Sequence, residues 1–222
     1  DPALEVQAAG RILRLGQSKE VLIKRFCFRG TIEERIVKFH DEIKAGMMIK
    51  MSLKEALLRY GEKLVIAATG AIAKKGKAVE DEVRVIYDGT NGVFLNRGIK
   101  IRDQVACPTA PDIKAVLTEL HEEGGSFFSL LFDISKAHRR VPVLREEWGR
   151  QACQVKGSAA ATLQAKRAKE NATAPRPLAR SDFSPAELAE DVYVNTVGTF
   201  GVSSAGYWWG RAGASAMRLA HY

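Results

Sequence analysis

The stretch FFSLLFDISKAHRR, from Phe127 to Arg140, decides the fold that we expect for this chain. An almost unbroken apolar run leads straight into one acid, Asp133, and such a run predicts a buried strand. Because a carboxylate at the end of a buried strand must be hydrated, paired or bound to a cation, Asp133 is a candidate metal ligand. Arg139 and Arg140 follow, so the layout suits a site that holds a metal and faces phosphates. The alternative is an Asp that only caps the next turn.

The composition favours an intracellular protein with a polyanionic partner. The 222 residues and the apolar fraction of 46% permit a core in one or two domains. The net charge of +8 makes nucleic acid the first candidate partner, although a basic but otherwise ordinary protein is the alternative. The three cysteines form neither a metal-ligand spacing nor a disulfide framework, which indicates a reducing compartment, nuclear or cytoplasmic. The longest apolar stretch outside the predicted strand, residues 64–73, is too short to span a bilayer, so we expect no membrane partner.

Two further segments carry motifs that belong with the central stretch. Residues 82–104 contain a predicted strand, Val83 to Tyr87, followed by the turn sequence DGTNG. Residues 197–222 begin VGTFGVSSAGYWW. Together with the central stretch, these segments resemble the fingers and palm of a retrotransposon reverse transcriptase, an RNA-directed DNA polymerase, over roughly residues 77–222.

The resemblance implies a set of site residues. Asp133, followed by Ala137 and His138, resembles the first catalytic motif of the family. Asp133 would then be the catalytic carboxylate and, with the backbone carbonyl of Ile134, a ligand of Mg²⁺ in a two-metal nucleotidyl transfer. His138 stands where the family has the aromatic residue that screens the sugar 2′-hydroxyl. The other nucleotide-binding positions correspond to Arg84, Phe200 and Gly201. The implied partners are a template-primer and a nucleoside triphosphate.

The polymerase site is incomplete in this sequence. The family needs the paired aspartates of a Y-x-D-D hairpin after the Phe200 motif, but no Asp or Glu occurs between Phe200 and Tyr222. With one of three carboxylates, the palm is expected not to hold two metals productively. We therefore expect a fragment that is inactive as a polymerase.

The N-terminal segment carries a different resemblance. Residues 20–28 alternate as a strand, and Thr31 with Glu34 predicts a capping box at the start of a helix that ends near Gly46. The sequence motifs QAAGRILRLGQ and TIEER resemble the end of the second recombinase-like lobe of Swi/Snf-type, SHPRH-like DNA translocases. The resemblance covers residues 7–44.

This second resemblance implies a contact with ATP. Gln7, Arg11 and Arg14 occupy the motif positions that reach the γ-phosphate, and a guanidinium fork suits phosphate oxygens. The alternative is that both arginines are solvated helix charges. No phosphate loop is recognised: the glycines of Gly70–Lys77 are one residue too far apart, and Ala78 stands where Ser or Thr must hold magnesium. We therefore expect no ATP hydrolysis.

These observations predict a chimeric fragment of α/β (α+β) class. The expected order is a helicase-lobe remnant at 1–46, a helical linker at 47–76, fingers and first palm motif at 77–155, an exposed basic insert at 156–186 and a truncated second palm motif at 187–222. Two other interpretations stay open. One is a part of an ATP-dependent translocase with a decayed retroelement insertion, and the other is a non-catalytic, basic module that binds nucleic acid such as duplex DNA.

The sequence also predicts further secondary-structure elements and how they pack. We expect helices over 47–68, 112–123 and 203–222, a Gly and Lys loop over 69–78, and a strand over 192–199. The stripe Ile113, Val116, Leu117 and Leu120 should pack on the sheet. Trp208 and Trp209 are expected in the core rather than in a base-stacking platform. Residues 6–44 should pack little against residues 77–222, because the two parts resemble different proteins.

Overall fold

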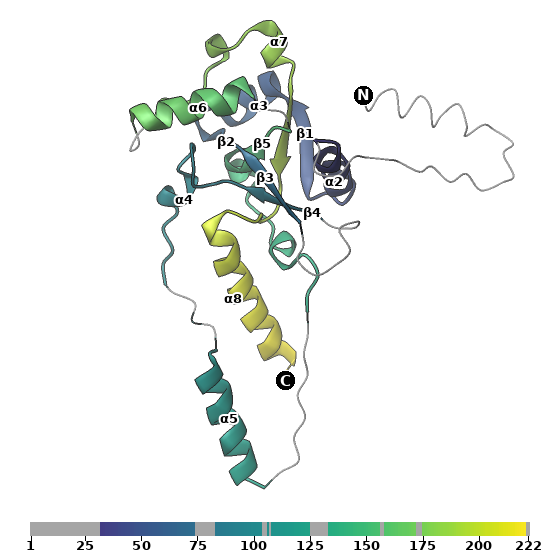
Figure 1. Ribbon diagram of the computed structural model, residues 1–222, viewed down its shortest axis with the longest axis vertical. Helices are drawn as coiled ribbons and strands as arrows, with labels where there is room; N and C mark the ends of the chain where they lie inside the picture. Colours follow the sequence, from purple (N-terminus) through teal and green to yellow (C-terminus); the bar gives the residue numbers. More distant parts are fainter. Residues whose placement is uncertain are drawn as a thin grey trace, which may run out of the picture.

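The computed structural model describes residues 32–73, 83–103, 106, 108–124, 133–155, 158–171 and 175–220. The fold is mixed α/β, as predicted, with helices packed around a small mixed sheet (Figure 1). The strands are β1 (Met48–Ser52), β2 (Ile66–Ala67), β3 (Thr69–Ala73), β4 (Val83–Tyr87), β5 (Ala152–Cys153) and β6 (Asp191–Asn195). The α-helices are α2 (Ile32–Lys44), α3 (Leu53–Tyr60), α4 (Leu95–Gly98), α5 (Ala110–Glu122), α6 (Ala159–Glu170), α7 (Pro185–Leu188) and α8 (Ser203–Ala220). Short 3₁₀-helices cover Gly61–Lys63, Ala137–Arg140, Arg145–Gln151 and Arg180–Asp182.

The four-stranded sheet has the order β1-β6-β5-β2, and β3 and β4 form a separate antiparallel pair. β6 pairs antiparallel with β1, from Met48 opposite Asn195 to Ser52 opposite Asp191. It also pairs antiparallel with β5, whose other neighbour, β2, is parallel to it. The central strand therefore comes from the C-terminal part of the chain and its edge partner from the N-terminal part.

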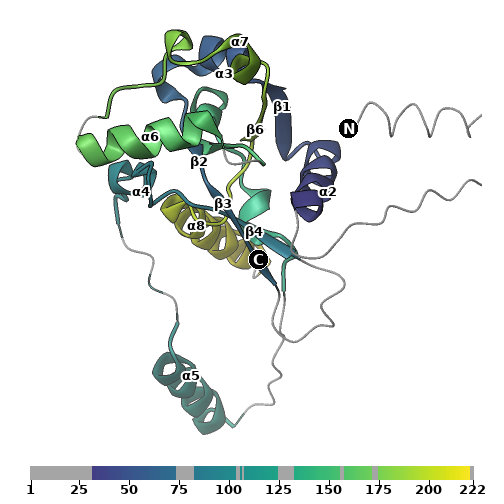
Figure 2. The same cartoon turned by 45° about the horizontal axis from the view of Figure 1, so that its top comes forward.

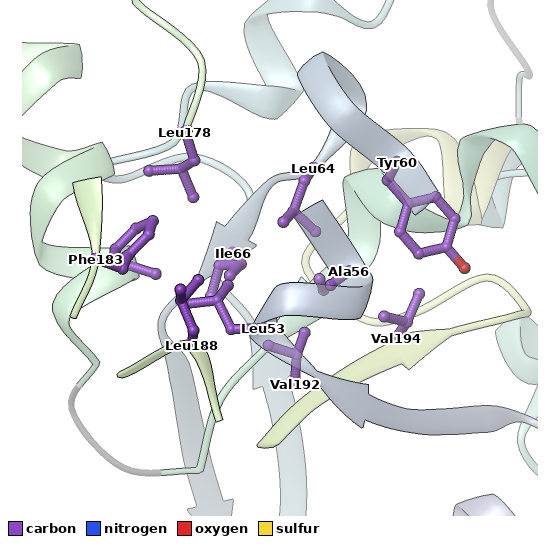
Figure 3. Packing of buried hydrophobic residues seen from close by; sticks show 12 residues of the cluster. Leu53, Ala56, Tyr60, Leu64, Ile66, Leu178, Phe183, Leu188, Val192 and Val194 are labelled. Atoms are coloured by element: carbon purple, nitrogen blue, oxygen red, sulfur yellow. The ribbon is translucent and has the colours of Figure 1, made fainter. Parts of the chain in front are cut away.

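Two hydrophobic clusters lie on opposite faces of β6, since successive side chains of a strand alternate. Val192 and Val194 join the first cluster, which Figure 3 shows between α3, β2 and the segment around Phe183. Tyr193 joins the second cluster, which consists of buried Phe39, Met48, Ala67, Tyr87, Cys153 and Tyr193. The second cluster underlies the candidate site described below.

The helical stretch predicted over 47–68 is wrong outside α3. Ser52 caps α3, because its hydroxyl accepts from the Glu55 N–H at 3.2 Å while Glu55 accepts from the Ser52 N–H at 2.8 Å. The residues before the cap form β1, and Leu58, on α3, is 89% exposed. The loop predicted from residue 69 is also corrected, since Thr69–Ala73 is β3.

The predicted strand Val83–Tyr87 is confirmed as β4, and the turn after it is closed by Asp88. The carboxylate of Asp88 accepts from the N–H groups of Thr90 and Asn91 at 3.1 and 2.9 Å. Helices are confirmed at 112–123 and 203–222, as α5 and α8, and a shorter strand, β6, is confirmed within 192–199. The strand predicted before Asp133 lies outside the described residues, as does the N-terminal strand over 20–28.

Three packing predictions are wrong. α5 has no buried residue and stands apart from the sheet in Figures 1 and 2. Trp208 is 53% exposed instead of buried in the core. The segment expected as an exposed insert contributes Ala160, Leu178 and Phe183 to the first cluster.

The expected separation between residues 6–44 and 77–222 is also wrong for the part that is described. Phe39 of α2 is fully buried and packs against Tyr193 of β6, with ring centroids 4.8 Å apart. A buried ion pair joins Glu42 of the same helix to Arg139. α2 is therefore part of one core with the later segments, whatever its origin, and the predicted domain boundaries stay predictions.

Candidate functional site

A cavity of about 440 Å³ lies between α2, β4 and the 3₁₀-helix Ala137–Arg140. Four of the predicted site residues line it: Asp133, Ile134, His138 and Phe200. They come from two segments more than sixty residues apart in the sequence. The structure therefore brings the first palm-like motif and the Phe200 motif to one place.

His138 and Phe200 form the contact between these two motifs. Their ring centroids are 4.8 Å apart and the rings are perpendicular, an edge-to-face arrangement that is favourable for aromatic pairs. His138 Nδ1 is buried and has no hydrogen-bond partner among the described residues. A small polar group in the cavity could satisfy this nitrogen.

The turn after Phe200 is held by hydrogen bonds to Tyr87 and Asn96. The Tyr87 N–H donates to the Phe200 carbonyl at 3.0 Å. The Asn96 side chain donates to the Gly201 carbonyl at 2.8 Å and accepts from the Ser203 N–H at 2.9 Å. Gly201 itself has a φ of +97°, a conformation that favours glycine. Gly201 thus shapes the turn and does not line the cavity.

Arg139 does not face a phosphate, which corrects the prediction for this residue. It is buried, and its guanidinium donates to the Glu42 carboxylate at 2.6 and 3.0 Å and to Asn195 Oδ1 at 2.7 Å. It also donates to the backbone carbonyls of Met47 and Gly198. A buried guanidinium needs such partners, so Arg139 joins α2, the sheet and the turn structurally. Arg140, in contrast, is exposed.

Glu42 is a residue of the cavity wall that the sequence did not single out. Burial raises the pKa of its carboxyl, but the charges of Arg139, Lys136 and Lys38 and the hydrogen bond from Arg139 lower it, and the pKa ends below its ordinary value of 4.5. Lys136 and Lys38 approach to 3.5 and 3.7 Å. Nothing in the helical pattern of α2 distinguishes this Glu from a surface one.

Among the described residues, the carboxylates at the cavity do not form the site for two Mg²⁺ ions that the polymerase family has. Asp133 is exposed and could be a ligand together with the Ile134 carbonyl, but the oxygens of Glu42 are engaged by Arg139 and Lys136. Within the described ranges, no group of three or more His, Cys, Asp or Glu side chains could hold a metal ion. We therefore derive no metal-dependent step.

The remaining predicted residues are Arg84, which is described by its strand register alone, and three residues outside the described part. Arg84 is in β4, opposite Ile72 of β3. Gln7, Arg11 and Arg14 lie outside the described residues. At the cavity wall, Cys153 is a buried free thiol whose pKa is raised by burial to about 12, so it is an inert part of the core. Among the described residues, none of the helices combines the length and apolar character that crossing a bilayer requires.

Comparison with known proteins relates one short segment of the chain to a DNA repair protein. A stretch of 36 residues, 16% of the chain, is 58% identical to DNA repair protein RAD5A of Arabidopsis thaliana, and it spans only 4% of that protein. No family model matches. The stretch is N-terminal, where the sequence resembles Swi/Snf-type translocases, and the comparison supports that resemblance for this stretch alone. It does not extend to the segments that resemble a reverse transcriptase.

Proposed function

We propose that this chain binds nucleic acid and does not catalyse a reaction by itself. One observation carries the proposal: beside the buried Glu42–Arg139 pair, the cavity wall holds two further cations, Lys38 and Lys136, against one further carboxylate, Asp133. Arg140, exposed in the same 3₁₀-helix, adds a further positive charge. The net charge of +8 and the short similarity to a DNA repair protein support the same partner.

The first prediction concerns salt. Binding to labelled single-stranded and duplex DNA, measured by fluorescence anisotropy, should weaken at least tenfold between roughly 50 and 200 mM salt, because several phosphates are neutralised by Lys and Arg. Binding should be independent of sequence. A dissociation constant that does not change over this range would contradict the electrostatic account.

Two charge reversals locate the contact. Lys136→Glu with Arg140→Glu should weaken DNA binding by about tenfold or more, since each substitution replaces a phosphate contact with a repelling charge. The slope of log K against log salt concentration should become shallower by roughly two to four. Lys54→Glu with Arg59→Glu is the matched control, because it also reverses two charges and both residues are exposed on α3, away from the cavity. Equal losses in both variants would mean that net charge alone, and not this site, governs binding.

A second candidate function is the RNA-directed DNA polymerase that the sequence resembles, in an incomplete form. The convergence of Asp133, His138 and Phe200 on one cavity favours it, because these residues belong to two separate motifs. A nucleotide base or sugar could stack against the His138 and Phe200 pair. A third candidate is a part of an ATP-dependent DNA translocase, which the N-terminal similarity favours.

The second prediction is that the chain shows neither primer extension nor ATP hydrolysis. Asp133 is the one carboxylate at the described cavity wall that is not held in an ion pair, and the loss of a single charge-stabilising group already costs about 10²–10³ in rate. Template-primed incorporation with Mg²⁺ or Mn²⁺ and an ATPase assay with DNA test this. Incorporation that disappears in Asp133→Asn would establish the polymerase instead.

A further inference from the structure

α5 presents an apolar stripe that the described residues of its own chain leave uncovered. Ile113, Val116 and Leu117 are 55%, 54% and 44% exposed. With half-buried Leu120 they follow the i, i+3, i+4, i+7 spacing of a helix that enters a groove. The helix begins with a complete capping box, in which the Asp112 carboxylate accepts from the Thr109 N–H at 2.7 Å. α5 is therefore a well-formed helix whose apolar face lacks a partner in the described part of the chain.

The body of the same chain carries an apolar groove of about 490 Å³ between α4, the segment 141–151 and the start of α8. Two of its lining side chains are large, apolar and mostly exposed: Leu144 at 73% and Trp208 at 53%. The other apolar lining residues are Leu95, Ile99, Val141, Pro142, Val143, Val202 and Ala205. The charged residues in its wall, Glu147 and Arg150, are paired with each other. The groove can thus accept apolar side chains without burying an unpaired charge.

The helix and the groove carry opposite charges around their apolar surfaces. The segment 110–123 has four acids, Asp112, Glu119, Glu122 and Glu123, against one lysine, Lys114, for a net charge of −3. The segments that flank the groove, 95–103 and 140–151, have six arginines and lysines against three acids, Asp103, Glu146 and Glu147, for a net charge of +3. Five of these cations, Arg97, Lys100, Arg102, Arg140 and Arg145, are exposed. The acidic helix with its apolar stripe therefore matches the basic-rimmed apolar groove both in apolar surface and in charge.

We propose that α5 of one chain docks into this groove of a second copy, and that the exchange is reciprocal. Each chain has this helix and this groove, so two chains that exchange helices satisfy both surfaces and close a two-fold symmetric dimer. The observed position of α5, apart from its own body in Figures 1 and 2, leaves the helix free for a second chain. The stripe supplies the i, i+3, i+4 and i+7 anchors by which an amphipathic helix binds in an apolar groove.

The third prediction tests the dimer with the full chain. Sedimentation or light scattering over a concentration series should show the mass rise from 24.4 kDa to twice that value. Leu117→Glu on α5 and Leu144→Glu in the groove should each raise the dimer dissociation constant by at least about 100-fold, because each places a charge in an apolar contact. Leu58→Glu is the matched control, since Leu58 is exposed on α3 and does not line the groove.

A mixing experiment distinguishes reciprocal exchange from other contacts. Leu117→Glu keeps an intact groove and Leu144→Glu keeps an intact helix, so a mixture of the two monomeric variants should regain a dimer that has one good contact. A mixture that stays monomeric overturns the proposal. A wild-type chain that is monomeric at every concentration also overturns it, because α5 would then bind the groove of its own chain. Open assemblies that grow with concentration overturn it as well. Circular dichroism of both variants should match the wild type, because both leucines are exposed in the folded chain.

Discussion

Replacing Glu42 by Ala should destabilise the fold by about 3–5 kcal/mol, because it leaves the Arg139 guanidinium buried without its countercharge. Both side chains of this pair are only 7% exposed, and the shorter of their contacts is 2.6 Å. Urea unfolding followed by circular dichroism measures the change. Glu62→Ala, at a glutamate exposed in the 3₁₀-helix Gly61–Lys63, is the control and should stay within about 0.5 kcal/mol of the wild type.

The dependence on pH gives this prediction a second, independent measurement. The pKa of Glu42 is lowered in the folded chain, so its ionised form stabilises the fold above its ordinary pKa of 4.5, and this contribution is lost as pH falls through the lower, folded value. The difference in unfolding free energy between wild type and Glu42→Gln should therefore narrow as pH falls below 4.5. If wild type and Glu42→Gln were equally stable at neutral pH, the charge of Glu42 would not stabilise the fold, and this account of the ion pair would be wrong.

Local signals in the sequence predicted the elements that depend on local interactions. The alternation at Val83–Tyr87 gave β4, and the 3.6-residue spacing of Ile113, Val116 and Leu117 gave α5. β1 was not predicted, because its partner, β6, lies about 140 residues away and its hydrogen bonds have no local signature. The same limit explains α5: periodicity shows that a helix has an apolar face, but it does not say what covers that face.

The candidate site was predicted only in part, because the sequence shows local motifs but not the long-range contacts between them. The two motifs led to Asp133, His138 and Phe200, and the structure gathers these three at one cavity. Arg139 was misjudged because an arginine beside a candidate metal site suits a phosphate as well as a buried carboxylate, and its partner, Glu42, is 97 residues away. Only the packing of α2 on β6 brings this pair together.

Gly201→Ala should destabilise the chain by about 3 kcal/mol or more, since the position combines a backbone conformation suited to glycine with a lack of space. Gly201 has a φ of +97°, and a Cβ there would lie 1.7 Å from the carbonyl oxygen of Tyr87. That carbonyl cannot easily move. Tyr87 pairs with Thr69 across β3 and β4, its N–H donates to the Phe200 carbonyl at 3.0 Å, and its hydroxyl donates to the Arg150 carbonyl at 2.7 Å.

Gly213→Ala separates this effect from the general cost of replacing a glycine. Gly213 lies within α8 and has no positive φ, and a Cβ at this position would meet no other atom of the described residues within 4 Å. Alanine there should therefore stabilise the helix by about 0.5–1 kcal/mol. Thermal and urea unfolding of the two variants should shift in opposite directions. Because Gly201 holds the Phe200 turn against β4, the destabilised variant should also bind DNA more weakly at a temperature where it is still folded. If Gly201→Ala were as stable as Gly213→Ala, the turn would not lie against the Tyr87 carbonyl. The position of Phe200 at the cavity wall would then be wrong as well.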